Sequence, residues 1–198
     1  DPVVVTNASG STAGFGSSAA TITESSSDSA GNKLNDTTAT AVVVNRSQFG
    51  PTTNSNAPSG GYSALFNGSI VEQSYGRPDI DMIQVTLKAG EKLTLDIDGN
   101  GSVNTIVKIL NSSGTELARN DNSQTLDPGS SNTTDSYLTY TVPSDGTYYV
   151  SVQSYSGSDD GTYNLWMNIQ PVANTSGSGT FEYTLTEGSV NDTAIVDV

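Results

Sequence analysis

The sequence predicts an all-β fold, organised as an antiparallel β-sandwich. Apolar and polar residues alternate through the stretch 135–169, and such a period of two places one set on a core face. Gly, Ser, Thr and Asn are abundant, and no long helical pattern appears. Hydrophobic residues make up 33% of the chain, which is enough for a modest core. Together these observations favour a sandwich with long loops.

The first part of the chain predicts little core. Two short strands, at Val3–Val5 and 20–23, have too few apolar residues to fold alone. A polar linker and a strand at Val42–Val44 follow, and then a long loop from Arg46 to Tyr62. Loops of this length in compact domains are either functional or disordered, and the sequence leaves both open.

The middle of the chain carries the strongest strand signals. Alternating apolar residues predict strands over 82–87, 93–97, 106–110, 137–142, 148–153 and 163–169. Pro143 ends one of them because it has no N–H to donate to a neighbouring strand. Gly146 closes the turn that follows.

Composition and charge exclude several kinds of function. The chain has no Cys and no His, which removes disulfides, thiolate chemistry and the usual general base of hydrolases. We also find no nucleophile elbow, phosphate loop or zinc motif, and we predict that the chain is not an enzyme. Its net charge of −14 repels nucleic acid and anionic membranes but suits Ca²⁺. The alternative is that the acidic residues only keep a secreted protein soluble.

The order of several motifs resembles one bacterial family. Pro143 is followed by Gly-Thr-Tyr-Tyr-Val at 146–150 and by Gly-Thr-Tyr-Asn-Leu at 161–165. Gly68 with Ile70 precedes an Asp-Ile-Asp motif at 79–81. In this order and spacing, the motifs resemble the bacterial pre-peptidase C-terminal (PPC) domain over roughly Asn32 to Ile169. The resemblance implies a jelly-roll-like sandwich.

The two ends of the chain suggest a second unit. Segments 181–186 and 193–198 look like the last hairpin of a bacterial immunoglobulin-like or cadherin-like repeat. We predict that residues 1–25 and 172–198 form a split immunoglobulin-like domain, and that residues 26–171 form a PPC-like domain inserted in it. The ends of inserted domains usually lie close together, which makes this arrangement reasonable. No basic, apolar signal segment opens the chain, and we interpret it as an excised piece of a larger protein.

Calcium is the strongest site hypothesis. Asp79 and Asp81 are separated by one residue, so an extended strand would turn both carboxylates the same way. The resemblance implies Asn35, Asp36, Asp79 and Asp81 as ligands, with the Tyr163 main chain beside them.

Two observations complicate this site. Lys33 stands where the family usually has Glu, although Glu24 and Asp28 are nearby acids that would substitute. The alternative role for Asp79 and Asp81 is to cap a turn through Asx-type hydrogen bonds.

A second group of residues is predicted to bind a ligand. Asp121, Asp127 and Asp135 occur in one loop and are also a second candidate site for calcium, where the alternative is a solvated acidic loop. Tyr155 and Trp166 would supply the aromatic platform of a sugar site. The alternative for Trp166 is burial in the core, because lone Trp residues are usually well buried.

These observations lead to a functional hypothesis. We predict a calcium-stabilised, extracellular ligand-binding module of a type I-secreted, RTX-type bacterial surface adhesin. It would bind a glycan or protein on another surface, as a monomeric part of a multidomain chain, without nucleic acid or membrane insertion. One alternative is a non-catalytic accessory domain that targets a secreted peptidase to its substrate. The other is a structural spacer that binds only calcium.

Overall fold

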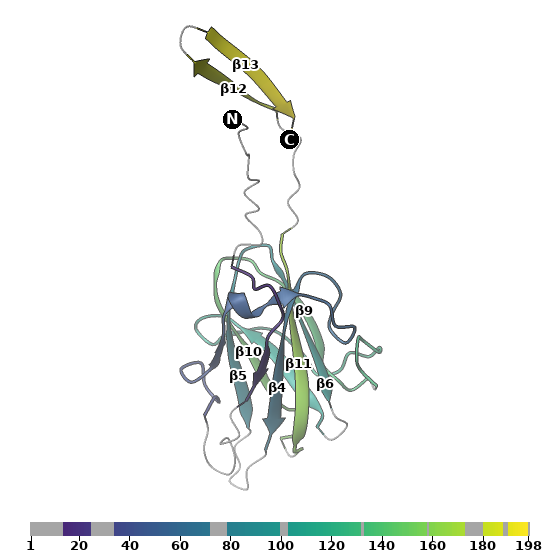
Figure 1. Cartoon of the computed structure of the whole chain (residues 1–198). Coiled ribbons are helices and arrows are strands. Elements are labelled where there is room, and N and C mark those ends of the chain that lie inside the picture. Colours follow the sequence, from purple (N-terminus) through teal and green to yellow (C-terminus); the bar gives the residue numbers. More distant parts are fainter. Residues whose placement is uncertain are drawn as a thin grey trace.

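The computed structural model has two layers of β-strands that face each other (Figure 1). It describes residues 14–24, 34–71, 79–99, 103–131, 133–157, 159–172, 180–187 and 190–197. Among these residues there is no α-helix, and the single short helix is the 3₁₀ turn η1 (Arg46–Gln48). The predicted all-β sandwich is therefore confirmed. None of the described residues form a helix long and apolar enough to cross a membrane.

The strands divide between two main sheets. Sheet A contains β1 (Thr21–Thr23), β3 (Gly50–Pro51), β4 (Tyr62–Ile70), β6 (Lys92–Gly99), β9 (Tyr137–Thr141) and β11 (Gly161–Gln170). Sheet B contains β2 (Val42–Val44), β5 (Ile80–Leu87), β7 (Thr105–Leu110), β8 (Glu116–Asn120) and β10 (Gly146–Ser154). A separate two-stranded sheet is formed by β12 (Thr180–Glu187) and β13 (Val190–Asp197).

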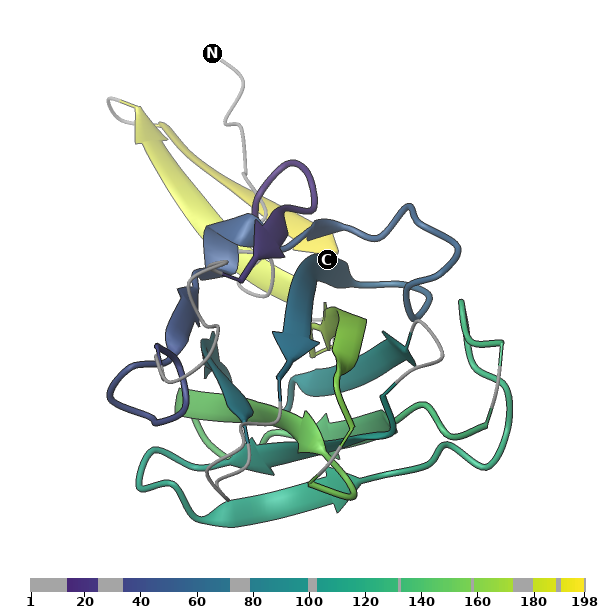
Figure 2. The ribbon, with the colours of Figure 1, turned by 90° about the horizontal axis from the view of Figure 1, so that it is seen from below.

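Strands that are neighbours in sequence often lie in opposite sheets. The order is β1-β4-β11-β6-β9 in sheet A, with β3 beside β4, and β2-β5-β10-β7-β8 in sheet B. The stretch β9, β10, β11 therefore crosses from sheet A to sheet B and back, which Figure 2 shows from one end of the sandwich. Pairing is antiparallel except at two edges, where β1 runs parallel to β4 and β2 runs parallel to β5.

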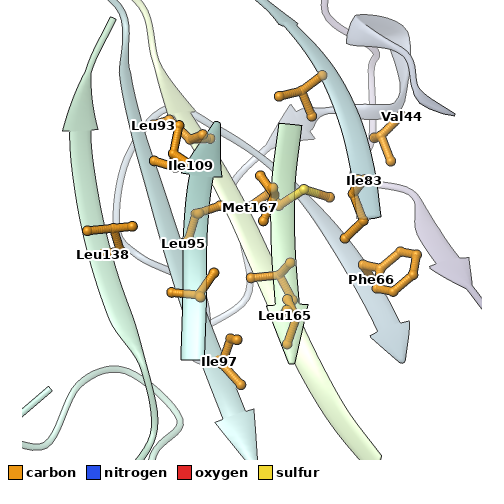
Figure 3. Packing of buried hydrophobic residues seen from close by; sticks show 14 of the residues in the cluster. Val44, Phe66, Ile83, Leu93, Leu95, Ile97, Ile109, Leu138, Leu165 and Met167 are labelled. Carbon is orange, nitrogen blue, oxygen red and sulfur yellow. The ribbon is translucent and has the colours of Figure 1, made fainter. Parts of the chain in front are cut away.

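The core lies between the two sheets. Sheet A contributes residues such as Leu95 and Leu165, and sheet B contributes residues such as Ile83 and Ile109 (Figure 3). All four are 0% exposed. They fall at alternate positions of their strands, so the period-two pattern predicts which face is buried.

The long loop before β4 is part of the packed structure. Phe49, which follows η1, is buried in the main core. The Asn168 side chain donates hydrogen bonds to the carbonyl oxygens of Pro58 (3.1 Å) and Gly60 (2.6 Å). These contacts fix the loop against the outer face of β11.

The predicted domain boundaries are only partly described. β1 lies in sheet A, so this portion of the segment 1–25 pairs with the sandwich. β12 and β13 pair with each other as the predicted hairpin. Residues 1–13, including the predicted strand Val3–Val5, lie outside the described residues, and the split immunoglobulin-like domain stays a prediction.

Candidate functional site

Asp81 and Tyr163 meet between the two sheets. Asp81 shares the inward face of β5 with Ile83, and Tyr163 shares the inward face of β11 with Leu165. The Tyr163 hydroxyl donates a hydrogen bond of 2.5 Å to Asp81 Oδ2. Both side chains are buried, with 0% and 1% exposure. A polar contact thus joins sheet B to sheet A within an otherwise apolar layer.

Two further side chains complete this arrangement. Asn35 Nδ2 donates to Asp81 Oδ1 (3.0 Å) and to Glu24 Oε1 (3.2 Å). Glu24 Oε2 accepts hydrogen bonds from the backbone N–H (2.8 Å) and hydroxyl (3.1 Å) of Ser69. We call Glu24, Asn35, Asp81 and Tyr163 the core-end cluster.

Burial and a neighbouring acid shape the electrostatics of this cluster. Burial raises the pKa of Asp81, and the hydrogen bond with Glu24 and its charge raise it further. The hydrogen bonds from Tyr163 and Asn35 oppose this rise because they stabilise the carboxylate. Burial likewise raises the pKa of Tyr163, followed by the charge of Asp81.

The core-end cluster fits a calcium ion in its chemistry. Its donor atoms are oxygens of the kind that Ca²⁺ prefers. Asn35 Oδ1 is buried without a hydrogen-bond partner, while Asn35 Nδ2 lies between two carboxylates. If the Asn35 amide were turned by half a rotation, its carbonyl oxygen would take the place of Nδ2 between the two carboxylates. Which end of an Asn amide points where is assigned from such hydrogen bonds.

The other predicted calcium ligands lie near this cluster in the chain. Asp79 is buried, and its Oδ2 accepts a 2.7 Å hydrogen bond from the backbone N–H of Val71. This bond joins residues eight positions apart, so it differs from the local Asx-type cap given above as the alternative to metal binding. Asp36 follows Asn35 and is half-buried. Tyr163 contributes its hydroxyl, whereas the resemblance implied its main chain.

A second group of acids lies on the outer face of sheet A. Asp96 and Asp98 alternate with Leu95 and Ile97 on β6, so they point away from the core. Asp127, from the loop 121–136, reaches them there: one oxygen each from Asp96, Asp98 and Asp127 lie within 4.8 Å of one another.

A fourth acid from the same loop adds to this group. Asp135 is 3% exposed, and its negative charge raises the pKa of both Asp96 and Asp98. We call Asp96, Asp98, Asp127 and Asp135 the outer-face cluster.

The carboxylates of the outer-face cluster receive few hydrogen bonds. Both carboxylate oxygens of Asp96 and both of Asp127 are buried without a hydrogen-bond partner. Asp98 Oδ1 accepts one long hydrogen bond, 3.4 Å, from the Ser130 hydroxyl. Burial, followed by the charges of the other acids, raises the pKa of Asp96 to about 8 and that of Asp98 to about 6. Among the residues that the structure describes, Asp96 and Asp127 therefore have no hydrogen-bond donor to offset their burial.

The sequence predicted two of the four residues of the outer-face cluster as ligand-binding residues. It identified Asp127 and Asp135 but missed Asp96 and Asp98, although the alternation Leu-Thr-Leu-Asp-Ile-Asp places both acids on one face. Outward acids on a strand are normally solvated. Only the covering loop makes these two different, and the sequence does not reveal where that loop folds.

The remaining predicted ligand residues are separate from both clusters. Trp166 is only 7% exposed, which contradicts its predicted role as an exposed platform and agrees with the alternative of burial. It faces outward from β11, beside Asp96 in the register of β6. Tyr155 is 59% exposed at the end of β10. Asp121 is half-buried and does not belong to the group of converging acids.

Comparison with known proteins finds similarity in the central segment. The sequence model of the bacterial pre-peptidase C-terminal domain matches residues 79–154. Over 94 residues the chain is 33% identical to a probable subtilase-type serine protease of Deinococcus radiodurans. That match covers 44% of this chain and 12% of the protease, so the chain spans only a small part of that relative.

Two solved structures resemble the sandwich more distantly. A periplasmic inhibitor of g-type lysozyme, PliG from Aeromonas hydrophila, is 21% identical with a TM-score of 0.40, covering 66% of this chain and 96% of the inhibitor. The pre-peptidase C-terminal domain of a collagenase from Bacillus anthracis is 16% identical with a TM-score of 0.38, covering 54% and 87% of the two chains.

The resemblance to the PPC domain is confirmed over the matched segment. The matched domain is a non-catalytic part of peptidases, which agrees with the prediction of a non-enzymatic module over residues 79–154. The matched range includes Asp79 and Asp81 but neither Asn35 nor Tyr163. The RTX-type adhesin setting stays a prediction.

Proposed function

We propose that this chain is a non-catalytic accessory domain of a secreted bacterial peptidase, and that it holds the enzyme on a protein substrate. The observation that carries the proposal is the match of residues 79–154 to a peptidase-associated domain, together with the protease relative. These comparisons favour the accessory-domain interpretation over the adhesin interpretation. The net charge of −14 would help to keep such a secreted domain soluble.

The proposed partner is an insoluble protein. A binding surface of this kind needs exposed aromatic or apolar side chains, since such residues are enriched where proteins meet. Tyr155 is the most exposed aromatic residue that the structure describes, and it lies in the turn between β10 and β11. This position leaves both clusters and the core undisturbed when the side chain is changed.

A sedimentation assay tests the proposal. The chain is mixed with insoluble elastin, collagen or keratin, and in parallel with chitin and cellulose, and the bound fraction is measured. We expect retention on at least one protein and on neither glycan. Tyr155→Ala should lower the retention several-fold, whereas Leu117→Ala, at an exposed position on β8, should not. Retention on glycans alone would instead support the adhesin interpretation, and no retention at all would support a spacer.

Calcium at the core-end cluster is a second part of the proposal. Glu24, Asn35 and Asp81 would hold the ion, and Tyr163 would orient Asp81. Glu24 lies just after β1, while Asp81 lies on β5, so the ion would tie the two sheets together at one end. The bound ion would supply positive charge between the buried carboxylates. What supports this is the oxygen-rich donor set and the partnerless Oδ1 of Asn35.

A further inference from the structure

We propose that the outer-face cluster is a second calcium site, built by Asp96 and Asp98 on β6 and by Asp127 on the loop that covers them. It is separate from the core-end cluster, because Asp81 faces the core between the sheets and Asp96 faces outward from sheet A. The proposal goes beyond the accessory function and does not depend on it.

The geometry suits one ion of calcium's size. Ca²⁺ binds oxygens at about 2.3–2.6 Å, so two ligands on opposite sides of one ion are about 5 Å apart. The converging oxygens of Asp96, Asp98 and Asp127 lie within 4.8 Å of one another, inside this limit. Two ligands come from a paired strand, which fixes their separation, and the third comes from a loop, which can adjust.

Burial without partners gives independent support. Asp96 is 0% exposed, and neither of its carboxylate oxygens has a hydrogen-bond partner. A buried polar group without a partner is costly, and a buried charge is usually paired or bound to a metal. No Lys or Arg forms an ion pair with Asp96, Asp98 or Asp127 in the part of the chain that the structure describes. A divalent cation supplies the missing positive charge.

The close approach of the loop to β6 also needs an explanation. Gly129 has φ of +91°, and a Cβ at this position would lie 2.5 Å from Asp98 Oδ2. The loop therefore brings its backbone against one carboxylate and its Asp127 side chain against two. Without a cation, three carboxylates at this distance repel one another. Bound calcium would hold the loop 121–136 onto sheet A.

Terbium luminescence tests this site directly. Tb³⁺ replaces Ca²⁺ in oxygen-rich sites and emits when a nearby Trp transfers energy to it. Trp166 is the single Trp of the chain and lies beside Asp96 in the strand register. We expect saturable emission on excitation of Trp166 in the full chain, displaced by Ca²⁺. Asp127→Asn should remove most of this signal, and Asp81→Asn should leave most of it.

The design separates the two proposed sites. Asp121→Asn serves as the matched control, since Asp121 belongs to the same loop but not to the converging group, and it should keep the emission. Emission that survives both Asp127→Asn and Asp96→Asn but disappears in Asp81→Asn would overturn the second site and leave the first. Absence of saturable emission in the unaltered chain would overturn it as well.

Stoichiometry provides a second readout that does not depend on Trp166. Equilibrium dialysis against Ca²⁺ should give one bound ion fewer for Asp127→Asn than for the unaltered chain, with the circular dichroism spectrum unchanged. An equal number of ions in both proteins would contradict the proposal. The same measurement with Mg²⁺ should give weaker binding, because Mg²⁺ needs a near-ideal octahedron at shorter distances of about 2.1 Å.

Discussion

The core-end and outer-face clusters both contain a completely buried Asp, yet their surroundings differ. Asp81 receives hydrogen bonds from Asn35 and Tyr163, while Asp96 receives none. Asp81 lies between the sheets, where β11 brings one donor, Tyr163, and the segment before β2 brings the other, Asn35. Asp96 lies beneath a loop that brings further acids. The difference shows that burial alone does not define a metal site; the number of protein donors decides how much a carboxylate needs a cation.

Calcium removal should have the largest effect. If both clusters bind Ca²⁺, chelation removes two stabilising equilibria, each worth about 2.7 kcal/mol when free calcium is 100 times the dissociation constant. We expect a clear fall in Tm on addition of chelator, measured by differential scanning calorimetry. The fall should be about halved in Asp127→Asn and in Asp81→Asn. An identical Tm in calcium and in chelator would remove the basis for both sites.

The Tyr163 hydroxyl should matter more than other tyrosine hydroxyls. Tyr163→Phe leaves a buried oxygen of Asp81 with one donor fewer, and we expect the free energy of unfolding in chelator to fall by about 1–3 kcal/mol. Tyr137 is the matched control: it is beside Asp96 in the register and is only half-buried. Tyr137→Phe should lower the free energy of unfolding clearly less, as measured by urea denaturation. Equal losses would mean that the Asp81 contact is not distinctive.

Replacing the two buried acids should give effects of opposite sign in chelator. At pH 9, above the pKa of about 8, Asp96→Asn removes a charge that other carboxylates repel, so it should raise the Tm of the metal-free protein. Asp81→Asn disturbs an existing set of hydrogen bonds and should lower it. We expect the free energy of unfolding in chelator to rise by about 1 kcal/mol in Asp96→Asn and to fall by about 1 kcal/mol in Asp81→Asn. A fall of Tm in both variants would show that Asp96 has a stabilising partner within the protein.

An exposed acid gives the smallest expected effect. Asp145 accepts hydrogen bonds from the backbone N–H of Ala89 (2.8 Å) and from Lys88 Nζ (2.9 Å), which lower its pKa. Its contribution is present above the ordinary pKa of 3.8 and is lost as the pH falls through the lower folded value. Asp145→Asn should therefore reduce Tm slightly at pH 6, and the two proteins should converge near pH 2. A constant difference across this range would exclude the carboxylate as its source.

Much of the sandwich follows from the sequence, because apolar residues recur at every second position along β5, β6, β10 and β11. Which sheet each strand joins does not follow, since β9, β10 and β11 are separated by turns similar to those of hairpins but cross between layers. A two-residue period fixes the face of a strand and not its neighbour.

The candidate sites were likewise predicted only in part from the sequence. The family resemblance names Asn35 and Asp81 as ligands of one ion, and the structure places them in hydrogen-bond contact with each other and with Glu24, one of the nearby acids considered. Their binding of calcium stays a prediction. The convergence of Asp96 with Asp127 depends on the path of a loop between them, for which the sequence has no periodic signal. Burial of Trp166 has the same cause: it lies on the outward face of an inner strand that loops cover.

The position of β4 has a mechanical consequence. It pairs with β1 through Leu65 and with β11 through Tyr62, so the polypeptide enters and leaves the sandwich at the same end (Figure 1). Tension between these two points would peel β1 from β4 one hydrogen bond at a time, at low force, instead of shearing several together. Because Thr21 would separate before Thr23, the contact of Glu24 with Ser69, just beyond β1, would be among the last at this edge to break. A peptidase anchored to a fibre through this domain would therefore have a compliant tether.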